Sequence, residues 1–272
     1  MTRIAAFLYG VLCYAATVAS LVYAAGFLAN IGVPKSIDTA PTADTLRAVL
    51  TNLGLLGVFA VQHSVMARQG FKRLWTKIVP RTVERSTYCL FSAAALGLLM
   101  WQWQPMGGTI WHVEAAWARY LLFGLSLVGW VGVYYSSFLI NHFDLFGLRQ
   151  VWLHLRGREY TPLAFQTPTL YKWIRHPLYL GLTLAVWATP DMTVTHLLFA
   201  VGVLGYIIVG IQFEERDLIA SLGTRYAAYR RAVPMLLPLL RPKKLAKAGF
   251  AFFAIKGLLW LAMPFIVVQL GL

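Results

Sequence analysis

The residues best suited to chemistry lie in two polar stretches that one apolar hairpin separates. The first is RHPLYLG at 175–181, and the second is EER at 214–216. Pro177 lacks a backbone N–H and has a helical dihedral, which predicts that a helix begins at Leu178. The free N–H groups of its first turn, next to a preceding Arg and His, suit a carboxylate or phosphate. The two glutamates of the second stretch suit hydroxyl groups or a cation.

Two further polar groups stand at the ends of apolar segments. Gln62 and His63 close one segment, and NHFDLFGLRQ at 141–150 follows another. Ionisable groups beside membrane-length segments are expensive unless they have a function. Simpler interpretations remain open, because His63 could be interfacial and Arg149 could anchor lipid headgroups. The Arg of the RHPLYLG stretch could likewise be ordinary positive-inside flanking.

Composition places the chain in a membrane. Of its 272 residues 59% are hydrophobic and 12% are charged, which leaves too much apolar surface for a soluble domain to bury. The two cysteines, Cys13 and Cys89, lie inside apolar runs. They therefore offer neither a disulfide framework nor a zinc cluster. We expect one domain over residues 1–272.

The net charge of +14 is spread in a way that fits a membrane better than a nucleic acid. Six of the 24 basic residues lie between Arg68 and Arg85, five between Arg149 and Arg175, and eight between Arg216 and Lys247. With a cytoplasmic N-terminus, alternating spans put all three clusters on the cytoplasmic side. The positive-inside rule then explains the charge, and no nucleic-acid partner is expected.

The apolar segments predict an all-α polytopic membrane protein with about five to seven transmembrane or re-entrant helices. A span needs about 20 apolar residues to cross the bilayer. The expected helical segments are 4–28, 46–66, 84–103, 117–140, 178–189, 194–213 and 248–271. The segment 178–189 is short for a full crossing, which favours a broken or re-entrant hairpin. Two interfacial amphipathic helices are expected at 68–80 and 214–233, and an ordered cytoplasmic loop at 141–173.

Several motifs together carry a family resemblance. RHPLYLG, the EER one hairpin later and GTRYAAYRRAVP at 223–234 resemble the isoprenylcysteine carboxyl methyltransferase and phospholipid methyltransferase superfamily. QHSVMAR at 62–68, ERSTY at 84–88 and NHFDLFGLRQ are similar to its bacterial methanethiol S-methyltransferase branch, which is related to NnrU-type proteins. The resemblance covers about residues 50–240.

The resemblance implies S-adenosylmethionine as the cofactor, bound at the RHPLYLG and EER stretches. The cofactor carboxylate suits the helix start, its ammonium and ribose hydroxyls suit a glutamate, and its adenine suits a tyrosine ring. The residues expected to bind it are Arg175, His176, Pro177, Tyr179, Leu180, Gly181, Glu214, Glu215, Tyr226 and Tyr229.

The implied reaction is methylation of a small thiol, methanethiol, to dimethyl sulfide on the cytoplasmic side of a bacterial inner membrane. Only the thiolate is a good nucleophile, so a base or a nearby cation is useful. His142 could take the proton with Asp144 orienting it, or Asp144 could act alone, and Arg149 could stabilise the thiolate. His63 is the competing base.

Two other classes of function stay open. The acceptor could be a prenylcysteine carboxylate or a phospholipid amine, which requires a lateral opening between spans. The chain could also be a non-enzymatic transporter or a haem-linked membrane protein. No motif with metal-ligand spacing is present, and a metal site is not expected.

Overall fold

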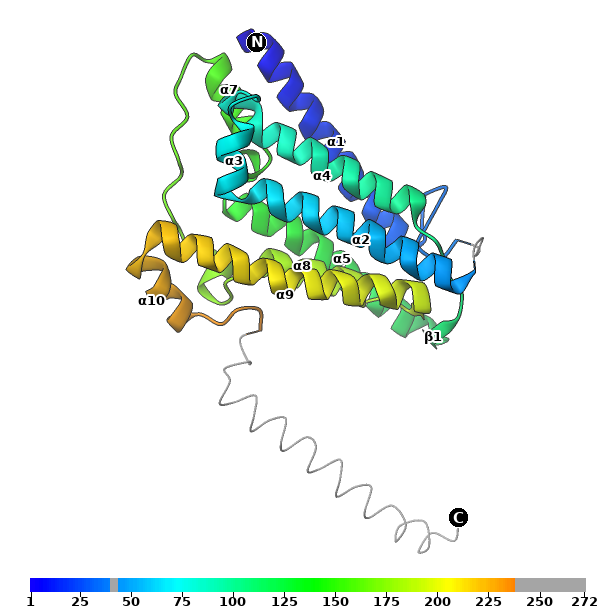
Figure 1. Cartoon of the computed structure of the whole chain (residues 1–272). Helices are drawn as coiled ribbons and strands as arrows, with labels where there is room; N and C mark the ends of the chain where they lie inside the picture. Colours follow the sequence, from blue (N-terminus) through cyan, green and yellow to red (C-terminus); the bar gives the residue numbers. More distant parts are fainter. Residues whose placement is uncertain (40–43, 238–272) are drawn as a thin grey trace, which may run out of the picture.

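The computed structural model describes residues 1–39 and 44–237, so the predicted span at 248–271 lies outside the described residues. Four helices in the described part are long and apolar enough to cross a membrane, and they run along one bundle (Figure 1). They are α1 (Arg3–Ala29), α2 (Thr45–Ala67), α5 (Ala116–Leu139) and α9 (Val194–Leu222). The prediction of an all-α polytopic membrane protein is confirmed.

The predicted span at 84–103 is the helix α4 (Arg81–Gln102), which is less apolar than those four. It packs against both α1 and α2. Its polar side chains therefore face protein partners instead of lipid. The Thr87 hydroxyl meets Tyr9 of α1 at 3.0 Å, and Ser86 donates to the carbonyl of Gly147 at 3.2 Å. Polar groups that have hydrogen-bond partners can be buried in a helix inside the bundle at a low cost in free energy.

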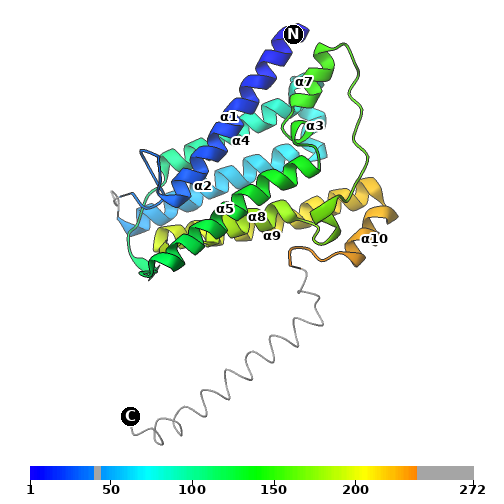
Figure 2. The same cartoon turned by 180° about the vertical axis from the view of Figure 1, so that it is seen from behind.

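One apolar core holds the bundle together at the end opposite the basic clusters. It joins buried residues of α1, α4 and α9 with Val186 of the short helix α8 (Pro177–Trp187). Trp103, fully buried, packs edge-on against Phe199 there. Toward the basic end two small clusters replace it, one around Val151 and one around Met66. At that end the helices are less tightly joined, and Figure 2 shows α1 diverging from α9.

The helix α8 has only 11 residues, and extended chain completes its path to the opposite end. There β2 (Asp191–Thr193) pairs antiparallel with β1 (Thr109–His112). Residues 188–190 between helix and strand are buried. Non-helical backbone at membrane depth is tolerated where protein encloses it. The segment predicted as broken or re-entrant is thus a short helix followed by a buried extended stretch.

The backbones of α5 and α8 touch each other. A Cβ atom added to Gly129 would lie 2.6 Å from the carbonyl oxygen of Gly181. One added to Gly181 would lie 2.8 Å from the carbonyl oxygen of Gly129. Small residues at such crossings allow the close approach by which membrane helices associate. The contact fixes the position of α8 relative to α5.

The prediction of a separate amphipathic helix at 214–233 is wrong. The helix α9 continues through both glutamates to Leu222, and α10 (Thr224–Ala232) follows Gly223. No breaker residue precedes Glu214, so the polar residues mark where the helix leaves the membrane and not where it ends. The break comes at Gly223, whose φ of 57° favours glycine. At 29 residues, α9 is about 43 Å long and exceeds the ~30 Å hydrocarbon core.

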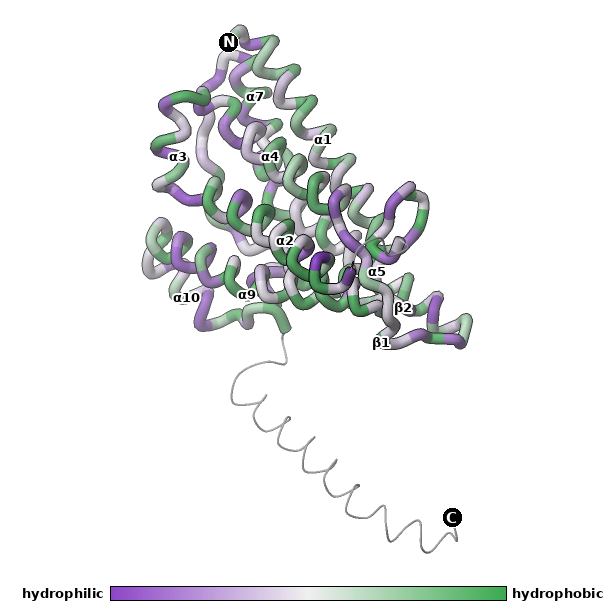
Figure 3. The backbone as a smooth tube through the Cα atoms, turned by 45° about the vertical axis from the view of Figure 1, so that its right-hand side comes forward, coloured by the Kyte–Doolittle hydropathy of each residue, from purple (hydrophilic) through white to green (hydrophobic). Residues whose placement is uncertain are grey.

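The segments expected at the membrane surface contain short helices. The interfacial helix predicted at 68–80 is α3 (Gln69–Trp75), whose Phe71 and Trp75 pack on the protein while Leu74 stays exposed. The loop predicted at 141–173 contains the helices α6 (His142–Leu145), α7 (Leu148–Leu155) and η1 (Thr169–Lys172). In Figure 3 hydrophilic residues colour α3 and α10 at this end of the bundle.

Candidate active site

The start of α8 is arranged as the sequence predicts. Pro177 occupies the first turn, and His176 is the N-cap residue without a side-chain hydrogen bond to that turn. The N–H of Leu180 is the first to bond back, to the carbonyl of His176 at 3.1 Å. The positive end of α8 is therefore left without a side-chain cap, and such an end attracts an anionic group.

Glu215 holds this region together and has no oxygen to spare. Its side chain is 5% exposed and contacts three basic side chains. Oε1 accepts from Arg175 Nε at 2.6 Å and from His176 Nε2 at 3.0 Å, and Oε2 pairs with Arg230 Nε at 2.8 Å. The carboxylate thus ties the loop before α8 to α9 and α10. Its geometry is that of a positioning residue, not of the cofactor ligand that was predicted.

Glu214 differs from its neighbour because its side chain is 44% exposed. Oε2 accepts a hydrogen bond from the Tyr179 hydroxyl at 3.0 Å and lies 4.0 Å from His176 Nδ1. The second oxygen stays available to a ligand. Glu214 is therefore the carboxylate of this pair that can receive an ammonium or hydroxyl group.

A strap formed by residues 233–235 closes the loop before α8. The backbone N–H groups of Arg175 and His176 donate to the carbonyls of Pro234 and Met235 at 2.9 and 3.1 Å. The Arg175 guanidinium also donates to the carbonyls of Arg230 and Val233. These bonds use Nε and Nη1 of Arg175, so this side chain shapes the site.

Tyr226 and Tyr229 pack against the segment that precedes α8, and Tyr229 is the more exposed of the two. Tyr226 is 2% exposed, and both rings pack edge-on against Phe165. The Tyr229 hydroxyl donates to the carbonyl of Tyr171 at 2.6 Å, and burial raises the Tyr229 pKa to about 12. An adenine contact does not fit the buried Tyr226, and for the partly exposed Tyr229 it stays a prediction. They anchor the segment before α8 onto α10.

His63 lies in a hydrogen-bonded group between α2 and α4. Ser92 donates its proton to the carbonyl of Tyr88 at 3.0 Å, so it accepts from His63 Nδ1 at 3.0 Å. That leaves the lone pair on Nε2, where the Tyr88 hydroxyl donates at 2.9 Å. The tautomer of His63 is thereby fixed. Both ring nitrogens of His63 therefore have hydrogen-bond partners, and its Nε2 faces the Tyr88 hydroxyl.

His142 repeats the same arrangement on α1, α5 and α6. Ser137 donates to the carbonyl of Tyr134 at 2.6 Å and accepts from His142 Nδ1 at 2.7 Å. The Tyr14 hydroxyl donates to Nε2 at 2.9 Å. The ring, 2% exposed, stacks on Phe138 with centroids 4.2 Å apart. Both nitrogens have partners, as in His63, but His142 is buried while His63 is partly exposed, so His142 is the less accessible of the two rings.

Asp144 and Arg149 bind each other and the chain that follows α7. Arg149 Nη1 lies 2.9 Å from Asp144 Oδ1 and donates to the carbonyl of Thr161 at 2.9 Å. The Tyr160 hydroxyl donates to the other Asp144 oxygen at 3.3 Å. This pair therefore fastens the segment that leads to α8. The helix α7, which carries Arg149, packs against α1 and α4.

The predicted site residues thus fall into separate groups at one end of the bundle. The start of α8 with Glu214 and Glu215 forms one group, and His142, Asp144 and Arg149 form another beside α7. His63 lies between α4 and α9, because Tyr88 and Tyr206 both pack against its ring, with centroids 5.1 and 6.3 Å apart. No group of residues able to hold a metal ion occurs in the part of the chain that the structure describes.

Comparison with known proteins decides the family. A methanethiol S-methyltransferase of Crocosphaera subtropica is 51% identical over 243 residues, 89% of this chain and 95% of the relative. That of Mycobacterium tuberculosis is 54% identical over 238 residues, 88% of this chain and 98% of the relative. The chain belongs to the methanethiol S-methyltransferase family.

More distant relatives extend this picture. Human nurim is 31% identical to this methanethiol S-methyltransferase family member over 182 residues, 64% of this chain and 69% of nurim. No family model matches the chain. No solved structure matches it either. The family assignment therefore rests on the curated relatives.

Sequence reasoning missed the partners that set the histidine tautomers in this family member. Tyr14 is separated from His142 by more than 100 residues, so no local pattern joins them. Tyr88 and Ser92 had a usable signal, because they lie one turn apart on a predicted span and so share a face. Arg230 could not be singled out from sequence, because it lies in the basic run at the end of GTRYAAYRRAVP.

His142 makes the stability of the folded chain depend on pH. Burial lowers its pKa below the usual 6.5, so just below that pH the unfolded chain binds a proton that the folded chain does not. Its contribution is complete above pH 6.5 and declines as the pH falls through the lowered pKa. We expect the free energy of unfolding of His142→Asn to fall less than that of the parent between about pH 7 and pH 5. Denaturant titrations in detergent at both pH values test this, and parallel losses would contradict it.

Proposed function

We propose that this chain transfers a methyl group from S-adenosylmethionine to methanethiol and releases dimethyl sulfide. The relatives named methanethiol S-methyltransferase support this most directly, because the chain covers 95% and 98% of the length of two of them. We place the N-terminus and the site on the cytoplasmic side of a bacterial inner membrane. The basic residues at the start of α1, on α3 and on α10 support that orientation.

The start of α8 fits the methionine part of the cofactor. Its uncapped first turn suits the carboxylate, and the free oxygen of Glu214 suits the ammonium or a ribose hydroxyl. Tyr179 and His176 orient Glu214, while Glu215 and Arg175 hold the loop. Leu180 and Gly181 contribute backbone to the same first turns of α8. Bound there, the cofactor supplies an electrophilic methyl group.

Thiol activation is assigned to Tyr88 and His63. The thiol S–H bond breaks as its proton moves to the Tyr88 oxygen, while the Tyr88 proton moves to His63 Nε2. The products are a thiolate and a protonated imidazole, so the charges balance. Ser92 keeps the accepting nitrogen toward Tyr88 throughout. Asp144, Arg149 and His142 act at a distance by holding the chain that leads to α8.

Methyl transfer from labelled S-adenosylmethionine tests the function. Detergent-purified protein is offered methanethiol, a prenylcysteine or phosphatidylethanolamine in separate reactions. We expect volatile labelled product from methanethiol alone. Label in the prenylcysteine or the lipid would assign the chain to those acceptors instead. Absence of both transfer and cofactor binding by calorimetry would favour the non-enzymatic functions.

Replacing Tyr88 with Phe tests the proton path. The ring and its packing remain, but the only hydroxyl that reaches His63 Nε2 within the described residues is lost. We expect kcat to fall by about 100-fold at neutral pH, the usual value of a positioned acid or base. Cofactor affinity should stay unchanged. Recovery of kcat toward the parent value at high pH, where the thiolate forms without help, distinguishes this role from a structural one.

Ser92→Ala provides the second measurement on this path. It removes the acceptor of His63 Nδ1 and leaves Tyr88 in place. We expect a smaller loss of kcat, about tenfold, because the tautomer is no longer fixed. Equal kcat in the parent and both variants would exclude His63 as the base.

A further inference from the structure

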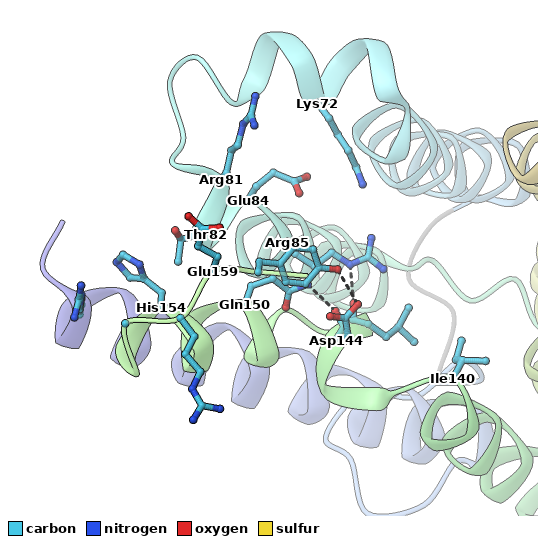
Figure 4. Close-up of a pocket in the computed structure, with 15 residues that line it drawn as sticks. Lys72, Arg81, Thr82, Glu84, Arg85, Ile140, Asp144, Gln150, His154 and Glu159 are labelled. Atoms are coloured by element: carbon cyan, nitrogen blue, oxygen red, sulfur yellow. Dashed lines mark hydrogen bonds between the residues drawn. The ribbon is translucent and has the colours of Figure 1, made fainter. Parts of the chain in front are cut away.

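A cavity at the basic end has no part in the proposed reaction. It has a volume of about 920 Å³ and lies between the start of α4, the helix α7 and the chain that follows α7 (Figure 4). Five of its lining residues are basic and come from four different parts of the chain: Arg3, Lys72, Arg81, Arg85 and Arg158. The helix α8 and the two glutamates of α9 do not line it.

In the described part of the chain, no acidic side chain pairs with the basic residues of this cavity. None of the five takes part in an ion pair within 4.0 Å in the described part of the chain. Arg85 donates Nε to the carbonyl of Leu145 at 2.7 Å, and Arg3 lies close to the backbone of Gly157. In Figure 4 Lys72 extends from α3 toward the side chains of Arg85 and Asp144. The positive charges thus converge on one space.

The charge of Lys72 is disfavoured by its burial and by the nearby Arg85. Burial and the charge of Arg85 lower the Lys72 pKa, and the opposing influence of Glu84 is smaller. An anion in the cavity would relieve both effects by supplying the missing charge. A phosphate group has the charge and the acceptor oxygens that several Lys and Arg side chains bind together.

Three carboxylates also face the cavity, and they narrow the chemical class of ligand that can bind there. Asp144 is already paired with Arg149, but Glu84 and Glu159 form no ion pair in the residues that the structure describes. A ligand that carries hydroxyl donors beside its phosphate can satisfy these two acids as well. The glycerol headgroup of phosphatidylglycerol has both features.

Exposed apolar residues on the chain segments that carry Arg3 and Lys72 favour a lipid over a free phosphate. Ile4 and Leu8 on α1 are 63% and 61% exposed, and Leu74 and Ile78 at α3 are 64% and 79% exposed. In a membrane these side chains lie among lipid tails next to Arg3 and Lys72. A lipid whose tails contact them can place its headgroup phosphate in the cavity.

We propose that this cavity binds the headgroup of an anionic phospholipid of the phosphatidylglycerol type, with Lys72 and Arg81 contacting the phosphate. The lipid then joins α1, α3, α4 and the chain after α7, which share only small apolar clusters at this end. Its role is to hold the basic end of the bundle together.

The test is lipid binding by the full chain in detergent, measured by native mass spectrometry and by the thermal midpoint. The double variant Lys72→Gln with Arg81→Gln is compared with Arg73→Gln with Lys77→Gln. The control pair removes the same charge from exposed residues that do not line the cavity. At about fivefold for each of the two basic residues, we expect the cavity variant to bind phosphatidylglycerol about 25-fold more weakly than the parent. The control should differ by less than about threefold.

Three outcomes would overturn the proposal. Equal weakening in the cavity variant and the control would show attraction to surface charge alone. Binding of phosphatidylcholine as tight as that of phosphatidylglycerol would exclude recognition of the anionic headgroup. Inorganic phosphate that raises the midpoint in the absence of any bound phosphatidylglycerol would identify a free anion as the ligand.

Discussion

Glu215→Gln is expected to lower the free energy of unfolding by about 3 kcal/mol and to abolish cofactor binding. Removal of one partner from a buried charge pair costs about 3–5 kcal/mol, because the other charge is left uncompensated. Here the partner is Arg175, whose side chain is 9% exposed, with His176 and Arg230 on the same carboxylate. Denaturant titration in mixed micelles and calorimetry with S-adenosylmethionine measure the two effects.

Glu214→Gln is the matched control, because it makes the same change one residue earlier. Its side chain is 44% exposed, so its loss leaves no buried charge unpaired. We expect stability within about 0.5 kcal/mol of the parent. Cofactor affinity should still fall, by about tenfold, through loss of a charge-assisted hydrogen bond. Equal stability losses in the two variants would contradict the division of roles between these glutamates.

Gly129→Ala is expected to cost about 3 kcal/mol of stability and most of the activity. The new methyl group would lie 2.6 Å from the carbonyl oxygen of Gly181. Backbone atoms cannot yield as a side chain can, so α8 must move away from α5. Overpacking of this kind typically costs about 1–3 kcal/mol. The start of α8 moves with it, and the cofactor residues are displaced.

Gly124→Ala on the same helix provides the comparison. An added Cβ there meets no atom within 4 Å. Alanine is also the better helix former, so we expect no loss of stability and a gain of up to about 1 kcal/mol. Thermal midpoints and methyl-transfer rates are measured for the parent and for both alanine variants in parallel preparations. Equal behaviour of the two alanine variants would show that α5 and α8 are not in backbone contact.

The sequence was informative wherever one local signal sufficed. Apolar length predicted the spans, and Pro177 predicted the start of α8. The motifs predicted the family before any comparison. The prediction went wrong at Glu214, where a change from apolar to polar residues suggested a new helix. In α9 the polarity reports the membrane boundary, while the backbone continues to Gly223.

The roles of individual site residues depended on contacts between distant parts of the chain. Glu214 and Glu215 are identical in type and adjacent, but the turn of the helix buries one and exposes the other. His63 and His142 each require a tyrosine from another helix to fix the tautomer. Such pairings come from tertiary packing, which hydrophobic periodicity does not encode. The roles of individual ligands and bases therefore stay predictions that the sequence alone does not determine.

The short helix α8 also constrains how the protein enters the membrane. Its 11 residues extend about 16 Å, roughly half of the hydrocarbon thickness, and buried extended chain covers the rest. Unpaired backbone groups of that extended stretch cannot face lipid tails. Insertion of α8 by itself is thus unfavourable, and it must enter together with α9 against an α5 that is already in place. The loop before α8 is closed by the carbonyls of Pro234 and Met235, so this end of the bundle can form only after at least 235 residues have been synthesised.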